Sequence, residues 1–428
     1  ANMYLKLLLS ALVIALSLNL VPNTVIAQKN YKPGYVVTHQ GDTIKGLIQF
    51  LEWDNNPEKI NFKPSLSEKE TAYDVLLIRS FQVANEIYET AIVQKELSPR
   101  TIDAITSSPE YILNIDTVFV KLLSGGNKSL YYLKNVNEEA NLYIKRNNTI
   151  ELLLYKKYIN VINGVTQIAE RKDYITQLSD YLPECATVFD HIESVRYKKS
   201  DLVVMFKEYF KCTGNDVAYI ETSEHIKSKF GILAGVQHTN AVFKSNSATF
   251  DEIENTTFNK PVSFTAAVYA DLILPRTLDK WSIYNELAYS YYQLNGSHVT
   301  DQQNPAGATY YFYRLQFGYL KMYNMLKYTH PVKQAKVYFK AGISNGYMFQ
   351  PKENYKRKEQ RYITTIVTES QAIFSLKKYE LGGAASAGLQ YKNLSAELRY
   401  EFSNGAAHIS NVKTNVHRTS LLIGFCFN

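Results

Sequence analysis

The second half of this chain consists of long segments in which apolar and polar side chains alternate. In the segment 280–294, for example, Leu287 and Tyr289 alternate with Glu286 and Ser290. This period of two is typical of a β-strand whose two faces meet different surroundings. Each segment has at least about the 10 residues that a tilted strand needs to cross a bilayer. There are eight such segments: 230–243, 262–274, 280–294, 309–323, 335–349, 377–391, 393–402 and 418–427.

The connections between these segments indicate which fold the strands form. Alternation alone fits a soluble sandwich, with its apolar face inward, and a membrane barrel, with its apolar face toward lipid. The connections after the first, third, fifth and seventh segments are long, whereas others, such as 275–279, are short. This pattern is typical of the extracellular loops and periplasmic turns of a barrel. We therefore predict an eight-stranded antiparallel up-and-down outer-membrane β-barrel over residues 227–428.

The residues before the barrel are predicted to form a targeting segment and a soluble domain. Residues 1–27 have the pattern of a signal peptide, because Lys6 precedes an apolar run and small residues follow it. Residues 28–165 contain short β segments separated by turn residues, which predicts a β-rich periplasmic domain. An even number of strands leaves both barrel ends on the periplasmic side, where this domain is expected. The fold class is therefore β-dominated throughout, with one short helical segment.

That helical segment is predicted within residues 166–226, where the apolar residues follow a helical period. It either completes the core of the soluble domain or binds a partner protein. Cys185 and Cys212 lie on two helical pieces separated by a turn, so we predict a disulfide between them in the oxidising periplasm. The alternative is that both are small buried apolar residues. Cys426 is expected to remain a free buried thiol in the lumen.

The polar face of the predicted barrel carries charged residues that are expected to meet in the lumen. A barrel of eight strands is only wide enough for side chains to fill, so these charges should pair and plug it. A catalytic carboxylate pair or a proton path is the alternative. On the strand 309–323 the same rule points Leu315 toward lipid and Gln316 toward the lumen. The predicted lumen charges are Glu286, Arg314, Lys340, Glu380, Glu397, Arg399 and Glu401.

A second group of charges lies in the predicted loop 351–371. This loop is expected either to be solvated or to contact the phosphates of outer-leaflet lipopolysaccharide. The candidate contacts are Lys352, Lys356, Arg357, Lys358 and Arg361. The sequence has no HExxH or Cys-x-x-Cys pattern, so we expect no metal and no cofactor. The net charge of +7 is spread along the chain without a nucleic-acid motif, so no nucleic acid is expected as a partner.

Three stretches of the barrel resemble the PorT-like outer-membrane β-barrel proteins of Gram-negative envelopes. These stretches are 286–291, 314–319 and the end of the chain at 424–428. The resemblance implies a barrel in the outer membrane and, from some relatives, a role in secretion or envelope assembly. Our expectation is a non-enzymatic protein that anchors a periplasmic domain and binds envelope components, including lipid and a periplasmic or surface protein. The alternatives are a barrel enzyme acting on lipid and a narrow solute channel.

Overall fold

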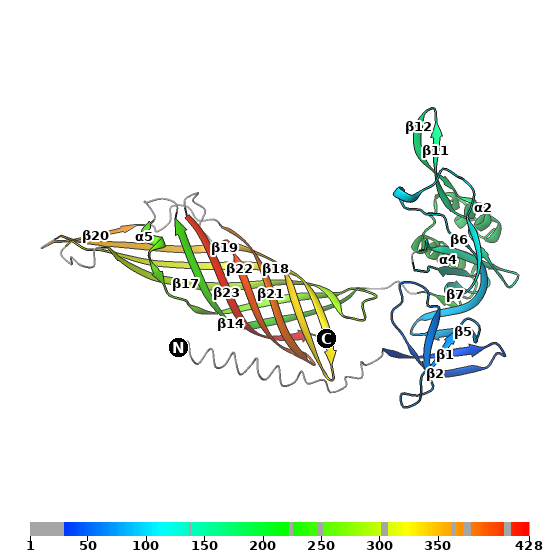
Figure 1. Ribbon diagram of the computed structural model, residues 1–428, viewed down its shortest axis with the longest axis horizontal. Helices are drawn as coiled ribbons and strands as arrows, with labels where there is room; N and C mark the ends of the chain where they lie inside the picture. The colour runs from blue at the N-terminus through cyan, green and yellow to red at the C-terminus, as the bar shows by residue number, and fades with distance from the viewer. Residues whose placement is uncertain are drawn as a thin grey trace. The chain divides into compact units, whose positions relative to one another are not determined.

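The chain divides into two compact units, Ala1–Ser223 and Glu224–Asn428, which we describe separately (Figure 1). The computed structural model describes residues 30–136, 138–221, 226–245, 251–300, 307–361, 364–370, 378–405 and 412–427. The predicted signal peptide 1–27 lies outside the described residues. No helix in the described parts of the chain is both long and apolar enough to cross a membrane.

The first unit is built on an antiparallel sheet of eleven strands in the order β10-β9-β8-β7-β6-β5-β1-β2-β3-β4, with β13 paired to β7. Its first hairpin turns at Gly41, which has a φ of 96°, a conformation that glycine adopts without strain. Val36, Phe81 and Phe119 are buried in one of its cores. The strands are β1 Tyr31–Thr38, β2 Thr43–Gln49, β3 Lys59–Lys63, β4 Thr71–Asp74, β5 Ile78–Val83, β6 Glu86–Glu96, β7 Leu113–Gly125, β8 Leu130–Leu133, β9 Asn141–Arg146, β10 Thr149–Leu152 and β13 Tyr219–Ile220.

The predicted helical segment begins later than expected and packs onto this sheet. Its first residues belong to β12 (Val165–Arg171), which pairs with β11 (Lys156–Ile162) in a separate hairpin that projects from the unit (Figure 1). Asn163 and Gly164 both have positive φ at the tip, as a tight hairpin turn requires. Leu178 and Phe206 of the helices share a core with Ile144 of the sheet. The helices are η1 Ile102–Ala104, α2 Asp173–Tyr181, α3 Ala186–Phe189, η2 Ile192–Ser194 and α4 Lys199–Thr213.

The second unit is a closed ring of eight antiparallel strands, as the sequence predicted. Each strand pairs with its neighbours along the chain, and the first and last pair from Phe230↔Phe427 to Ser245↔Val412. Two short strands and a helical turn are added: β15 (Thr257–Phe258), β20 (Thr364–Ser370) and α5 (Asp251–Glu254). The ring strands are β14 Lys227–Ser245, β16 Val262–Ile273, β17 Trp281–Thr300, β18 Thr309–Val332, β19 Ala335–Arg361, β21 Tyr379–Tyr391, β22 Leu394–Ser403 and β23 Val412–Phe427.

The two ends of the ring differ in the length of their connections. We call the end with the short connections, for example between Val332 and Ala335, the turn end, and the opposite end the loop end. At the loop end β17 and β19 run past their predicted limits, β18 runs past its predicted limit at the turn end, and the predicted loop 351–371 is largely strand. The prediction was wrong because it limited the strands to bilayer length, whereas backbone hydrogen bonds between neighbouring strands continue into water.

Candidate functional site: the barrel lumen and the outer rim

Alternation along the strands separates an outer face from a filled lumen. Leu287 and Leu398 are exposed on the outer face, whereas Glu286 and Arg399 are buried inside, as predicted. On β18 the predicted phase is wrong, because Leu315 is buried and Arg314 is exposed. The reason is that this part of the lumen is packed with aromatic and aliphatic side chains instead of charges. The apolar phase of that strand therefore points inward.

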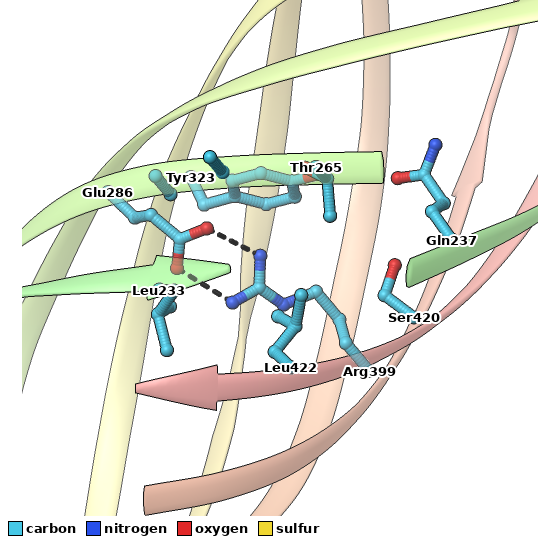
Figure 2. Close-up of a pocket in the computed structure, with 10 residues that line it drawn as sticks. Leu233, Gln237, Thr265, Glu286, Tyr323, Arg399, Ser420 and Leu422 are labelled. Atoms are coloured by element: carbon cyan, nitrogen blue, oxygen red, sulfur yellow. Dashed lines mark hydrogen bonds and ion pairs between the residues drawn. The ribbon is translucent and has the colours of Figure 1, made fainter. Parts of the chain in front are cut away.

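The first group of lumen charges is centred on Arg399 of β22. Its two terminal nitrogens donate to the carboxylate of Glu286 at 2.6 and 2.7 Å, in a bidentate pair across the lumen (Figure 2). Glu397 accepts from Arg399 at 2.9 Å and pairs with Lys340 at 2.6 Å. The Tyr338 hydroxyl also donates to Glu397, at 3.1 Å. Each charge here has an opposite charge in contact, which compensates for the cost of burying it.

The second group is centred on Arg418 of β23, which is not among the predicted lumen charges. Arg418 donates to both oxygens of Glu380, at 2.5 and 3.0 Å. Lys321 of β18 lies between Glu380, at 2.9 Å, and Glu401, with which it also forms an ion pair. The Tyr323 hydroxyl donates to Glu401 at 2.8 Å. This group joins four strands of the ring.

A third pair joins Asp271 of β16 to Lys327 of β18 at 2.6 Å. Neither residue is among the predicted lumen charges. Asp271 is a single charge within an apolar run, but Lys327 lies beyond the end of the predicted strand 309–323. The predicted phase of that strand also placed Lys321 on the lipid face. With this pair included, the buried charges of the described lumen balance. There are five cations, Lys321, Lys327, Lys340, Arg399 and Arg418, and five carboxylates, Asp271, Glu286, Glu380, Glu397 and Glu401.

Little open space remains around the Arg399 group. A cavity of about 10 Å³ lies beside Glu286 and Arg399 and is lined further by Gln237, Thr265 and Ser420 (Figure 2). A space of this size holds about one water molecule.

Toward the loop end the lumen is filled by aromatic rings. Tyr292, Leu315 and Tyr319 belong to one buried cluster, and the rings of Tyr292 and Tyr319 stack at 6.1 Å. Ile253 of α5 is buried in the same cluster. The charged and aromatic layers together close the described part of the lumen.

The predicted loop cations lie on β19 and have three kinds of surroundings. Lys356 pairs with Glu369 of β20 at 2.8 Å, and Glu359 pairs with Arg361 at 2.9 Å and Arg357 at 3.5 Å. Lys358 lies over the ring of Phe312 at 5.6 Å. Lys352 is exposed and has no ionic partner among the residues that the structure describes.

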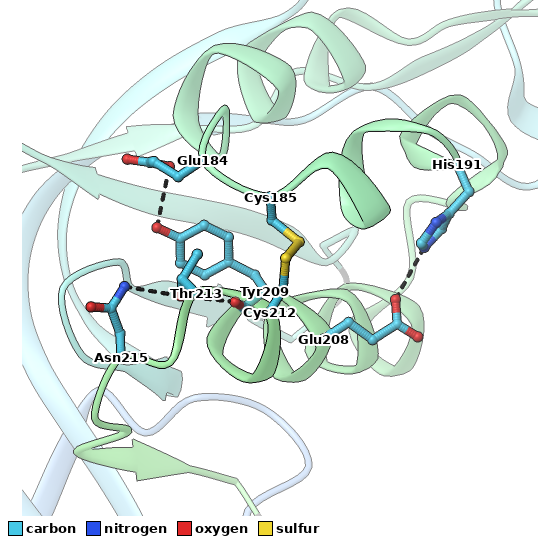
Figure 3. Close-up of a disulfide and its surroundings, with 8 residues drawn as sticks. All are labelled: Glu184, Cys185, His191, Glu208, Tyr209, Cys212, Thr213 and Asn215. Atoms are coloured by element: carbon cyan, nitrogen blue, oxygen red, sulfur yellow. Dashed lines mark hydrogen bonds and ion pairs between the residues drawn. A yellow bond between two sulfur atoms is a disulfide. The ribbon is translucent and has the colours of Figure 1, made fainter.

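Two features of the first unit concern its stability. Cys185 and Cys212 are joined by a disulfide that ties the start of α3 to α4 (Figure 3). The third cysteine, Cys426 of β23 in the second unit, is free and buried. Close to the connection to the barrel, Glu221 pairs with Lys121 at 2.6 Å and Lys199 at 2.8 Å. Burial alone would raise the pKa of Glu221, but the two lysines hold it below its ordinary value.

Comparisons with known proteins agree with this architecture. Residues 221–403 match the family described as outer membrane protein beta-barrel domain. Together with the closed ring of strands, this match defines the second unit as an outer-membrane β-barrel domain. In the described residues, no group of three or more His, Cys, Asp or Glu side chains is placed to hold a metal ion.

Three solved structures of other proteins are similar to this chain at low sequence identity. The outer membrane protein OprG from Pseudomonas aeruginosa is 13% identical with a TM-score of 0.30, over 49% of this chain and 100% of that chain. The attachment invasion locus protein Ail of Yersinia pestis is 13% identical with a TM-score of 0.23, over 47% of this chain and 100% of that chain. Neisserial surface protein A is 11% identical with a TM-score of 0.22, over 47% and 99%. No curated protein sequence gives a match.

Proposed function

We propose that this chain is a non-enzymatic outer-membrane protein of a Gram-negative envelope. In this proposal, the barrel anchors the β-rich first unit in the periplasm, and the protein binds envelope components, including outer-leaflet lipopolysaccharide and a periplasmic or surface protein. We further propose that it is related to the PorT-like barrels. A signal peptide at residues 1–27 would direct the chain across the inner membrane.

The observation that carries the proposal is the filled, electrically balanced lumen. Five buried cations and five buried carboxylates neutralise one another there, and a cavity of about 10 Å³ lies among them. A conducting pore needs a continuous water-filled path. The packing therefore favours an anchor over the alternative of a solute channel.

The chain's connectivity supports the periplasmic position of the first unit. β14 begins at the turn end with Lys227, and β23 finishes there with Phe427. In barrels of this class the short connections lie in the periplasm and the long ones outside the cell. A domain that enters the barrel at the turn end would then be periplasmic.

Two matched protease sites test the topology. One is inserted at Lys333, in the short connection between β18 and β19, and the other between Thr300 and Thr309, in the long connection before β18. Protease added to intact cells should cut only the second site and leave the first unit intact. Cleavage of the first site alone would reverse the topology and overturn the proposal.

Two assays on the purified protein address the alternatives. In planar bilayers we expect no stepwise conductance, because the charged and aromatic layers fill the lumen. Regular conductance steps would favour the channel. Incubation with outer-membrane lipids should leave them unchanged, and turnover of lipid by the purified protein would favour the barrel enzyme.

A further inference from the structure

The outer wall changes abruptly from apolar to polar at one level of β17, β18 and β19. Tyr291 and Phe349 flank Gly318 at the last level of the apolar wall. The next level toward the loop end joins Gln293, Gln316 and Lys352, and the level beyond joins Asn295, Arg314 and Asn354. A change from aromatic to polar side chains is typical of the boundary between acyl chains and head groups. This part of the wall therefore lies at head-group level.

A groove of about 700 Å³ lies on the wall just beyond this boundary, between β15 and β20. Its volume is within the range of sites for small organic ligands. The groove combines a cationic, an aromatic and several amide side chains. Among its lining residues are Asn259, Asn295, Phe312, Arg314, Asn354 and Lys356.

Two cations at the groove are available to an anion. Arg314 lines the groove, and Lys352 lies on the neighbouring strand β19, two residues before Asn354, which also lines the groove. In the register of β18 and β19, Gln316 lies opposite Lys352 and Arg314 lies opposite Asn354. Arg314 and Lys352 are therefore diagonal neighbours, with their backbones roughly 7 to 8 Å apart. Both are exposed, and within the described part of the chain neither has an ionic partner.

The other cations of the groove region are already engaged. Lys356 lines the groove but is neutralised by Glu369, which also lines it. Glu359 pairs with both Arg357 and Arg361, and Lys358 lies over the ring of Phe312 at 5.6 Å. The positive charge that can meet a phosphate is therefore concentrated at Arg314 and Lys352, beside the lipid boundary.

We propose that this groove binds a phosphorylated glycolipid of the outer leaflet. Arg314 and Lys352 contact its phosphates, since guanidinium and ammonium groups both bind phosphate oxygens well. Asn295 and Asn354 offer amide donors and acceptors to sugar hydroxyls. The acyl chains descend along the apolar wall below Tyr291 and Phe349. The inference rests on the proposed function, because the loop end must face the cell exterior.

The amide side chains favour a glycolipid over a phospholipid as the occupant. A phosphatidylglycerol head group presents one phosphate and two hydroxyls, whereas a phosphorylated sugar head group presents more hydroxyls for hydrogen bonding with the amides. Charge alone would attract both lipids similarly.

The test measures binding of a bisphosphorylated, fluorescent disaccharide glycolipid to the full chain in phosphatidylcholine nanodiscs. Each basic side chain near an anionic lipid contributes roughly fivefold in affinity, so Arg314→Gln/Lys352→Gln should weaken binding about 30-fold. The same glycolipid without phosphates should bind weakly to the unchanged protein and be insensitive to the substitutions. Phosphatidylglycerol should compete poorly.

The matched control removes two cations from the outer face of another pair of strands. Lys244 of β14 and Lys413 of β23 are exposed and directly opposite each other near the loop end. Lys244→Gln/Lys413→Gln should change binding by less than about twofold, since each lies outside the groove. Heat-modifiable migration on a gel verifies that both variants retain the closed barrel.

Several results would overturn the proposal. An equal loss in the control pair would mean non-specific attraction, and unchanged binding by the Arg314 and Lys352 variant would remove the site. Equal competition by phosphatidylglycerol would exclude a glycolipid as the selected occupant. If the protease sites are cut as expected, any of these results removes the glycolipid site but leaves the barrel as a membrane anchor. If the protease sites show the reversed topology, the glycolipid site and the proposed function are both overturned.

Discussion

Removal of the Arg399 side chain should strongly destabilise the barrel. Arg399 donates two hydrogen bonds to Glu286, at 2.6 and 2.7 Å, and two to Glu397, at 2.9 and 3.0 Å. Arg399→Met removes all four bonds. Among the described residues, the Tyr284 hydroxyl, at 3.1 Å, is then the one remaining hydrogen-bond donor to the buried Glu286 carboxylate. Glu397 keeps its ion pair with Lys340.

The expected cost is about 3 to 5 kcal/mol in the free energy of unfolding. Four bonds to charged groups at roughly 1.5 to 3 kcal/mol each would sum to more. However, removal of the arginine also removes its own desolvation cost, so the smaller figure applies. Most of the loss comes from the carboxylate that remains buried without a cation.

The second substitution in this test removes that carboxylate. Glu286→Gln/Arg399→Met should recover at least half of the loss, because a neutral amide is cheaper to bury than an unpaired carboxylate. Lys227→Met, which breaks an exposed pair with Asp279, serves as the surface control and should cost under about 1 kcal/mol.

Urea unfolding of the folded protein in lipid vesicles measures these differences, and heat-modifiable migration checks that the barrel has closed. An Arg399→Met variant within about 1 kcal/mol of the unchanged protein would refute the central role of the network. A double variant no more stable than the single one would refute the argument that the unpaired carboxylate is responsible.

Three further predictions concern the strand phase, the disulfide and the response to acid. Arg314→Cys should react with a water-soluble maleimide on the folded barrel, whereas Leu315→Cys should react only after unfolding. The opposite result would support the predicted phase of β18, in which Leu315 faces outward and Arg314 faces the lumen. The disulfide closes a separation of 27 residues, so Cys185→Ser and Cys212→Ser should each lower the free energy of unfolding of the first unit, measured in urea, by roughly 3 to 4 kcal/mol relative to the unchanged protein. No change in either variant would mean that the thiols are reduced in the native protein. Because its pKa is lowered in the folded state, Glu221 stabilises the first unit above its ordinary pKa of about 4.3, and this contribution is lost as the pH falls through the folded value. Hydrogen exchange of the full chain should therefore show a shallower acid loss of stability for Glu221→Gln, and parallel curves would contradict the assignment.

The barrel could be predicted from the sequence because lipid imposes a simple rule on its strands. Outer residues such as Leu398 and Ile423 must be apolar, while positions such as Glu397 alternate with them, and this contrast is visible without coordinates. The rule failed at Leu315, beyond the lipid boundary. There the outer face meets polar surroundings and the lumen is packed with rings, so the apolar phase is reversed.

Pairing partners could not be predicted in the same way. Arg399 and Glu286 are separated by 113 residues, and Arg418 and Glu380 by 38, so no local pattern connects them. The closed ring brings them into contact across the lumen. The same closure leaves Arg314 and Lys352 on the outer face without an ionic partner in the described chain, although Lys356 close by is paired.

The sequence by itself determined that the second half is a membrane barrel of eight strands, since a period of two and alternating connection lengths are local properties of the chain. Strand pairing and register, which close the ring, decided which charges neutralise one another and where the strands leave the lipid. Local alternation reports only that the two faces of a strand meet different surroundings. Which face is the lumen depends on neighbouring strands, and that information exists only in the tertiary structure.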